Sequence, residues 1–124
     1  MNSIKTILII EDNQETLLLY GEILRSEKFN VIETTNGGRA LEVLKTSPIL
    51  PDLILMDLTF PYPFMSAEDF VSSLRGNQAW RTIPILIISG QIDIEERSRA
   101  LKANGLIKKP FDLDQFVGTV KGSL

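Results

Sequence analysis

Five polar residues stand at the ends of short apolar segments, and their types suit the chemistry of metal ions and phosphoryl groups. They are Glu11, Asp12, Asp57, Ser89 and Lys109. If one site gathers them, its three carboxylates repel one another. A hard divalent cation such as Mg²⁺ relieves that repulsion, since it prefers carboxylate, carbonyl and water oxygens and leaves room for a phosphoryl oxygen. This chemistry requires that the fold bring the five side chains together.

The composition excludes several other kinds of active site. The chain has no cysteine and no histidine. Disulfide scaffolds, thiol nucleophiles, serine–histidine–aspartate chemistry and zinc sites of the usual Cys/His kind are therefore ruled out. Any chemistry in this protein must use carboxylates, hydroxyls and lysines.

Length and charge set further limits. With 124 residues, the chain has the size of one domain, so we expect a single domain over residues 1–124. The net charge of −3 gives no electrostatic footprint for nucleic acid. No apolar stretch has the length of a membrane span or the layout of a signal peptide. We expect a cytoplasmic protein that binds neither nucleic acid nor membrane.

Five segments predict β-strands. Three are continuous apolar runs and two are weaker, and they lie at 7–10, 53–56, 85–88, 30–34 and 106–108. Apolar runs that do not alternate with polar residues are typical of strands covered on both faces, as in a parallel sheet.

Between these segments the apolar residues recur at helical spacing, as in the first interval with Leu17, Leu18, Ile23 and Leu24. Three later intervals begin with a capping pattern, in which an acceptor side chain precedes an acidic or amide residue by three positions. The pairs are Ser66 with Asp69, Asp93 with Glu96 and Asp112 with Gln115. The segment 93–104 has few apolar residues, so we expect its helix to be the most exposed.

This alternation predicts an α/β fold, a doubly wound five-stranded parallel sheet with five helices in a flavodoxin-like (βα)5 arrangement. Such sheets bind ligands beyond the carboxyl ends of their strands. The five polar residues all fall at that edge, so we expect three carboxylates, one hydroxyl and one ammonium in one cleft.

Four short motifs in this order resemble the landmarks of response-regulator receiver domains of two-component signalling. The motifs are Leu8-Ile9-Ile10-Glu11-Asp12-Asn13, Leu55-Met56-Asp57-Leu58, Ile88-Ser89-Gly90 and Lys109-Pro110-Phe111. Each motif alone is weak, but together they span nearly the whole chain and are strong. The resemblance implies a Mg²⁺-dependent phosphoprotein that catalyses only its own phosphorylation and dephosphorylation.

The resemblance also implies a metal site and a phosphoacceptor. Asp57 would accept the phosphoryl group and contribute to the metal site. Asp12 would bind Mg²⁺ directly, Glu11 would hold it through a water molecule, and the backbone carbonyl of Thr59 would complete the protein ligands.

Three further residues take roles from the same resemblance. Lys109 would pair with Asp57 and then with the phosphoryl oxygens. The Ser89 hydroxyl would move to hydrogen-bond the phosphoryl group. Pro110 would follow a cis peptide bond that directs Lys109 into the cleft.

The implied partners are a sensor histidine kinase or phosphotransfer protein as phosphodonor and a downstream protein target of unknown identity. A small phosphodonor could replace the kinase. A homodimer through the fourth strand, fourth helix and fifth strand is a further option for this family.

The sequence departs from the family in three places. Leu106 stands where an aromatic switch residue is usual, so coupling from Ser89 to the fifth strand would be weaker or differently routed. The loop that follows Asp57, at about 59–66, is longer than usual and is a candidate for partner choice. Gly90 replaces a common alanine and would leave the phosphorylation site open to a donor.

Two alternative functions remain open. The first is an interaction module on the same fold that works without phosphorylation, and Leu106 is its best support. The second is a small hydrolase such as an aspartyl-phosphate phosphatase. Against the hydrolase, Thr59 stands two residues after Asp57, where a second aspartate would serve as general acid. Nucleotide binding is disfavoured because the chain has no phosphate-binding glycine motif.

Overall fold

The fold is a regular alternation of strands and helices. It was obtained as a computed structural model, and it describes residues 3–58 and 65–124. The strands are β1 (Thr6–Ile10), β2 (Asn30–Thr34), β3 (Leu53–Asp57), β4 (Ile85–Ser89) and β5 (Gly105–Lys108). The helices are α1 (Gln14–Ser26), α2 (Gly37–Thr46), α3 (Ala67–Arg75), α4 (Ile94–Ala100) and α5 (Leu113–Gly122).

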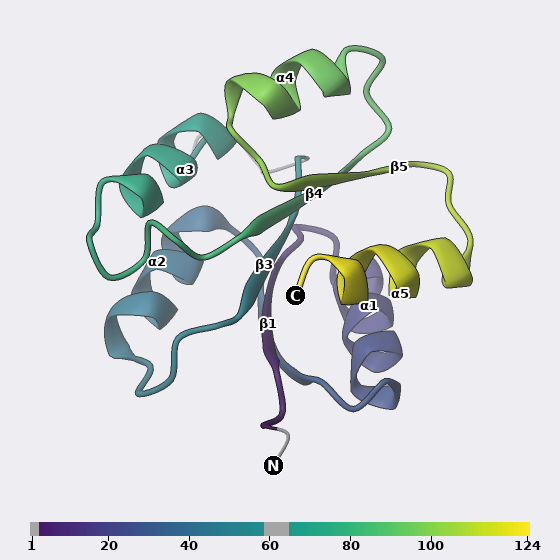
Figure 1. The fold of residues 1–124 in the computed structure, drawn as a ribbon, viewed down its shortest axis with the longest axis horizontal. Coiled ribbons are helices and arrows are strands. Elements are labelled where there is room, and N and C mark those ends of the chain that lie inside the picture. The colour runs from purple at the N-terminus through teal and green to yellow at the C-terminus, as the bar shows by residue number, and fades with distance from the viewer. Residues whose placement is uncertain (1–2, 59–64) are drawn as a thin grey trace.

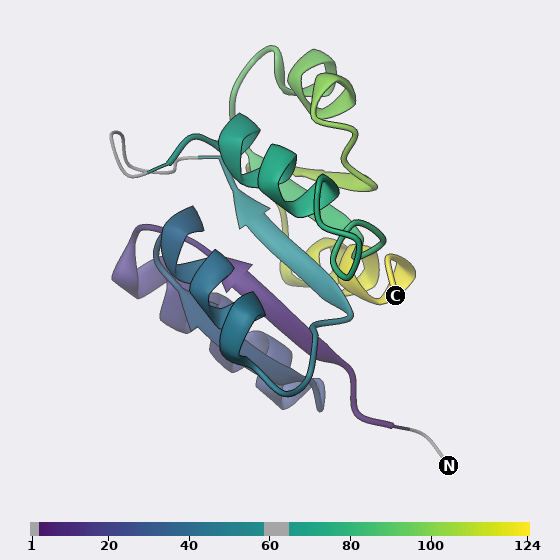
Figure 2. The same cartoon turned by 90° about the vertical axis from the view of Figure 1, so that its left-hand side faces the viewer.

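The strands form one parallel sheet in the order β2-β1-β3-β4-β5. Helices cover both faces, with α1 and α5 on one and α2, α3 and α4 on the other, as Figures 1 and 2 show. The predicted fold class is therefore confirmed. Among the described residues, each strand starts within one residue of its predicted position.

The central strands β1, β3 and β4 are buried along their whole lengths. Neighbouring residues point to opposite faces, so Leu8 and Ile10 join one hydrophobic cluster while Ile7 and Ile9 join the other. Each fully buried side chain of this size contributes roughly 1.5–3 kcal/mol to folding. This two-sided burial explains why the strand sequences show no polar alternation.

Side-chain caps begin most of the helices. Ser66 Oγ accepts a hydrogen bond from Asp69 N at 3.0 Å, and Asp112 Oδ1 accepts one from Gln115 N at 2.7 Å. Both predicted caps are confirmed. The third, at Asp93, is wrong: Asp93 makes no capping hydrogen bond, because its backbone (φ −96°, ψ 25°) is not in the extended conformation of a side-chain cap.

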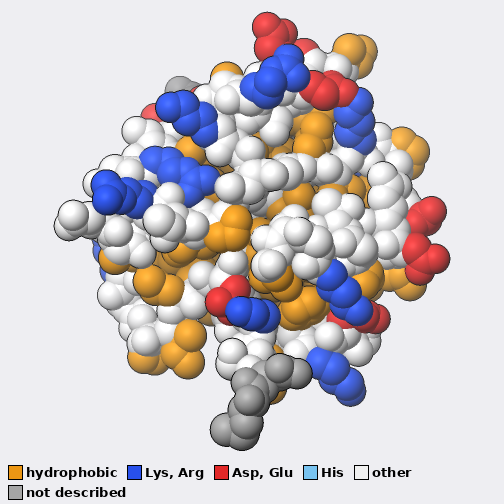
Figure 3. All heavy atoms as spheres, viewed as in Figure 1, with side chains coloured by type: hydrophobic (Ala, Val, Ile, Leu, Met, Phe, Trp, Pro, Cys, Tyr) orange, Lys and Arg blue, Asp and Glu red, His pale blue; other side chains and the backbone are white. Residues whose placement is uncertain are grey.

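Helix α4 is short and buries only Ile94 and Ser98 of its own residues. The prediction that this helix is the most exposed is wrong: three of its seven residues are exposed, against six of ten in α5, because α5 buries only Phe116 and Val120. In the space-filling view, hydrophobic side chains show in patches across the visible face, and basic and acidic side chains lie both between them and at its edges (Figure 3). No helix within residues 3–58 and 65–124 is long and apolar enough to cross a membrane.

Candidate functional site

The carboxyl edge of the sheet carries the predicted site residues. Asp57 is the last residue of β3 and lies in register with Ile88, next to the end of β4. Ser89 ends β4 and lies opposite Lys108, so the following residue, Lys109, also reaches this edge. Parallel pairing in this strand order therefore places residues from distant parts of the chain side by side.

An ion pair joins Asp57 and Lys109. Lys109 Nζ lies 2.6 Å from Asp57 Oδ2, and only 1% of the Asp57 side chain is exposed, against 35% for Lys109. A buried carboxylate is costly without a charged partner, and the ammonium supplies one. Lys109 is thus the solvent-facing member of the pair, and Asp57 is the buried one.

Glu11 is the second buried acid at this edge. Its Oε1 accepts a hydrogen bond from Asn13 N at 3.1 Å, while Oε2 is buried and receives no hydrogen bond from the described residues. Burial, followed by the neighbouring Asp57 carboxyl, raises the pKa of Glu11 from 4.5 to about 8, and the Asn13 N–H and Lys109 ammonium act in the opposite direction. Glu11 and Asp57 can share this space when one of them holds a proton or a cation lies beside them.

This arrangement fits a hard divalent cation. The buried Glu11 Oε2 is an oxygen ligand without a donor of its own, and it lies beside a second carboxylate, which is the donor set that Mg²⁺ prefers. Asp12 follows directly and is exposed to solvent. Within the described parts of the chain, no three acidic side chains already meet as a closed metal cluster. Thr59, predicted as a carbonyl ligand, lies outside the described residues.

Ser89 is buried at the end of β4, and its Oγ accepts a hydrogen bond from Gln91 N at 3.1 Å. Gly90 follows it, and a Cβ there would lie 3.4 Å from the Lys109 Cβ, at the limit of ordinary contact. Even a methyl group at position 90 would therefore touch the lysine stem.

The chain after β5 is anchored by aromatic rings. The Lys109–Pro110 peptide bond is cis, as predicted. Next to it, Phe111 stacks on Phe116 with a centroid distance of 5.5 Å, and Phe116 stacks on Tyr20 at 5.1 Å. These contacts fix the loop that carries Lys109 to helices α1 and α5.

Tyr20 is a residue near the site that the sequence analysis missed. It is buried, and its pKa is raised by burial first and then by the negative charges of Asp57 and Glu11. Its position three residues after Leu17 and four before Leu24, both buried, could have identified it as core-facing. Both acids raise the pKa of Tyr20, which agrees with the two carboxyl groups lying close to each other.

Leu106 is separated from these residues by the sheet. It lies in register with Ile87 on β4 and packs against the cluster that includes Ile94 and Leu101, on the side of α4. The structure thus brings Glu11, Asp57 and Lys109 together at one edge and puts Leu106 under the fourth helix.

The described residues form a flavodoxin-like α/β sheet with two buried acids and a lysine at its carboxyl edge. The family model of the response regulator receiver domain matches residues 7–121. This protein therefore belongs to the response regulator receiver domains of two-component signalling.

Similar proteins agree with this assignment. The polar-differentiation response regulator DivK of Brucella anthropi is 30% identical over 122 residues, which cover 97% of this chain and 96% of DivK. The phosphorylated cyanobacterial phytochrome response regulator RcpA superposes with a TM-score of 0.78 at 26% identity, covering 97% of this chain and 91% of its own.

A third similar structure is the receiver domain of a sensor histidine kinase from Pseudomonas aeruginosa, which has a magnesium ion coordinated in its active site cleft. It superposes with a TM-score of 0.83 at 22% identity and covers 98% of both chains. At this level of identity the likeness concerns the fold.

Proposed function

We propose that this protein is a phosphorylation-operated switch that accepts a phosphoryl group on Asp57 in a Mg²⁺-dependent reaction. The carrying observation is the buried Asp57 carboxylate, held 2.6 Å from the Lys109 ammonium at the ligand-binding edge of the sheet. A purely structural ion pair would not need a neighbouring buried acid such as Glu11, whose ionised form is destabilised by burial and by the nearby Asp57.

The proposed reaction needs little covalent help from the protein. An Asp57 oxygen attacks the phosphorus of a phosphohistidine or a small phosphodonor, the P–N or P–O bond breaks, and the leaving group keeps the electron pair. The product is an acyl phosphate. Phosphoryl transfer depends mainly on positioning and charge stabilisation, and Lys109 supplies a positive charge for the phosphoryl oxygens.

Glu11, Asp12 and Asp57 would hold Mg²⁺, together with the backbone carbonyl of Thr59. The ion supplies positive charge that neutralises the phosphoryl oxygens. Glu11 and Asp57 contribute the buried oxygens, and the exposed Asp12 lies on the solvent side, where a hydrated cation arrives. The magnesium ion in the receiver domain from P. aeruginosa supports this proposal by analogy.

Ser89 would then report the phosphorylation state. Its hydroxyl now accepts a hydrogen bond from Gln91 N, and a phosphoryl group on Asp57 offers a charged acceptor at the end of the neighbouring strand. Movement of Ser89 toward that acceptor shifts the loop that leads into α4. Leu106, packed under α4, would carry part of the change in place of an aromatic residue.

The expected partners are those of a receiver domain: a histidine kinase or phosphotransfer protein upstream and a target protein downstream. The surface that changes would include α4 and β5, which could also support a homodimer. The protein would act as a substrate and switch, without turning over an external substrate.

An interaction module that works without phosphorylation is the second candidate, and the observation in its favour is the aliphatic Leu106 at the switch position. The structure of phosphorylated RcpA, at 26% identity, supports the phosphorylated alternative. The two candidates differ in one measurable property, the formation of an acyl phosphate on Asp57.

The test is intact-protein mass spectrometry after incubation with Mg²⁺ and acetyl phosphate or phosphoramidate. We expect one phosphoryl group, lost at alkaline pH, on the wild-type chain and none on Asp57→Asn. Asp114→Asn, which changes an exposed acid of α5, is the matched control and should be labelled normally. A folded, Mg²⁺-binding wild-type protein that gains no phosphoryl group would contradict the proposal and favour the interaction module.

A further inference from the structure

A continuous chain of hydrogen bonds leads from Ser89 to helix α3. Ser89 Oγ accepts from Gln91 N at 3.1 Å, and the Gln91 side-chain oxygen accepts from Arg97 Nη1 at 3.1 Å. Arg97 also donates from Nε and Nη2 to the two carboxylate oxygens of Glu68, at 2.9 and 3.1 Å. One guanidinium therefore connects the loop after β4, helix α4 and the first turn of α3.

The contact between Arg97 and Glu68 has a defined geometry. Two parallel hydrogen bonds form a bidentate pair, which fixes orientation more strictly than a single contact. The Arg97 guanidinium holds the pKa of Glu68 below its ordinary value, and Glu68 in turn raises the pKa of Arg97. With 29% and 53% of their side chains exposed, the two residues add little to overall stability. Their main effect is to fix the position of Arg97 on α4 relative to Glu68 on α3.

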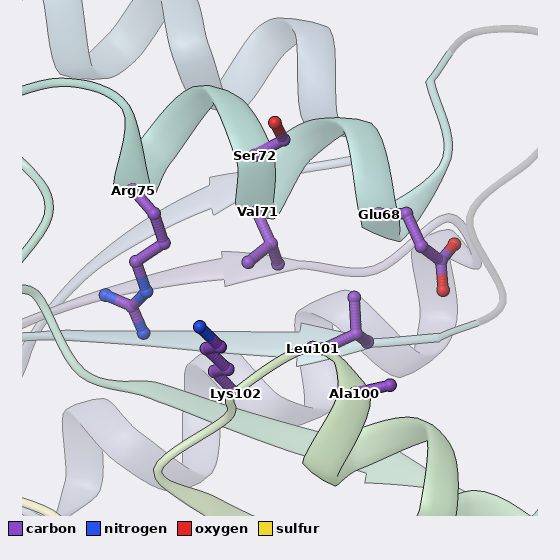
Figure 4. Close-up of a pocket in the computed structure, with 7 residues that line it drawn as sticks. All are labelled: Glu68, Val71, Ser72, Arg75, Ala100, Leu101 and Lys102. Atoms are coloured by element: carbon purple, nitrogen blue, oxygen red, sulfur yellow. The ribbon is translucent and has the colours of Figure 1, made fainter.

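The ion pair between Arg97 and Glu68 lies beside a groove between helices α3 and α4. A groove of about 210 Å³ separates α3 from the end of α4, with Val71 on one side and Leu101 on the other (Figure 4). Glu68 lies at one end of that groove, on the first turn of α3. Arg97 of α4 reaches Glu68 there, so the ion pair joins the two helices beside the groove.

We propose that Arg97 is a positioning residue, which through Gln91 holds the Ser89 hydroxyl turned toward Gln91 N and through Glu68 links that orientation to α3. The inference rests on the proposed function, because it assigns Arg97 a role in the response to a phosphoryl group on Asp57. The added claim is that an ion pair between α3 and α4 sets the free energy that is needed for Ser89 to turn toward the phosphoryl group.

The direction of the effect follows from which state contains the contacts. In the structure the Ser89 hydroxyl is turned toward Gln91 N and the whole hydrogen-bond chain is formed. When Ser89 turns toward a phosphoryl oxygen it loses Gln91 N, and the loop that carries Gln91 is released from it. Bonds that are lost when Ser89 turns oppose that movement, so removing them should shift the population toward the activated state.

The test measures the affinity of the full-length chain for beryllofluoride, a mimic of the acyl phosphate, by titration calorimetry at saturating Mg²⁺. Arg97→Gln and Glu68→Gln should each tighten beryllofluoride binding by roughly two- to fivefold, the range for an exposed ion pair. Neither substitution should change the affinity for Mg²⁺ alone. A merely structural role would change the binding of both ligands, whereas the proposed role changes only beryllofluoride binding. Urea unfolding confirms that each variant is folded.

Two further variants sharpen the comparison. Exchanging the charges in one protein, Glu68→Arg with Arg97→Glu, should return the affinity toward wild type, because the Gln91 amide can donate to the new carboxylate. Arg39→Gln breaks a comparable ion pair on α2, Arg39 with Glu42 at 2.9 Å, and should have no effect.

The outcomes distinguish a failure of the Arg97 role from a failure of the proposed phosphorylation of Asp57. Unchanged or weaker beryllofluoride binding in Arg97→Gln, with normal binding in the wild type, would overturn the role of Arg97 alone. A wild-type protein that binds Mg²⁺ but not beryllofluoride would overturn the proposed function and, with it, the inference.

Discussion

Lys109 Nζ lies 2.6 Å from Asp57 Oδ2 and is the positive charge beside a carboxylate that is almost completely buried. We expect Lys109→Met to slow phosphorylation by acetyl phosphate about 100-fold, the usual effect of removing one group that stabilises developing charge. The time course of the phosphorylated species in intact-protein mass spectrometry gives the rate.

The neighbouring lysine provides the control for this substitution. Lys108 forms an ion pair with the exposed Glu95 and lies away from the acidic pair. Lys108→Met should therefore keep the wild-type rate within about twofold. Equal rates for the two methionine variants would show that the position of Lys109 has no role in phosphoryl transfer.

Stability without metal should fall as the pH rises. The pKa of Glu11 is about 8 in the folded protein and near 4.5 in the unfolded chain, so between these values the folded state binds more protons. The stabilisation from the protonated carboxyl is complete below pH 4.5 and is lost as the pH rises toward 8. The slope approaches about 1.4 kcal/mol per pH unit for one proton. Urea unfolding in the presence of a chelator measures it.

The variant Glu11→Gln tests the source of this pH dependence, since its amide does not titrate. We expect its unfolding free energy to change much less over the same range. In the wild type, saturating Mg²⁺ should remove most of the slope because it replaces the proton between Glu11 and Asp57. An equal slope in Glu11→Gln would assign the effect to another group.

Two aspartates at helix starts should differ in their contribution to stability. Asp112 Oδ1 accepts from Gln115 N, while Asp93 makes no capping hydrogen bond. Asp112→Ala should lower the free energy of unfolding by about 1 kcal/mol, and Asp93→Ala by less than about 0.5 kcal/mol. Urea unfolding of the pair under one condition provides the comparison, and equal losses would contradict the assigned caps.

Leu106 should matter for the order of helix α4. It is partly buried and packs against the hydrophobic cluster that includes Ile94 and Leu101, so Leu106→Ala is expected to cost about 1–2 kcal/mol and to speed amide hydrogen exchange in α4. Leu113→Ala, at a leucine that is 57% exposed, is the matched control and should change stability by less than about 0.5 kcal/mol. Exchange in α4 that is equally fast in both variants would contradict this role.

The sheet could be predicted from the sequence because each central strand is buried on both faces and so has to be apolar throughout. The ends were less certain: β3 and β4 each include one more residue, Asp57 and Ser89, than the apolar run alone suggests. Those residues are polar because of their position at the edge, and they still make the backbone hydrogen bonds of the sheet.

The positions of the charged site residues could also be predicted, since parallel strands meet at one edge. The proximity of Asp57 to Lys109 follows from that rule. The link through Gln91, Arg97 and Glu68 could not be predicted, because it depends on how two helices on one face of the sheet lie relative to each other. The failure of the Asp93 cap has a similar reason, since a sequence pattern does not specify the backbone angles before a helix.

The proximity of Glu11 to Asp57 has a consequence for how this sequence can change. Two acids buried together oppose folding when no cation is present, so many substitutions that neutralise Glu11 would give a protein that survives heat better. A population of variants screened only for heat resistance would therefore be expected to lose this acid and to become poor at binding Mg²⁺. We expect variants to keep the acidic pair only when they are selected for Mg²⁺ binding as well as for folding.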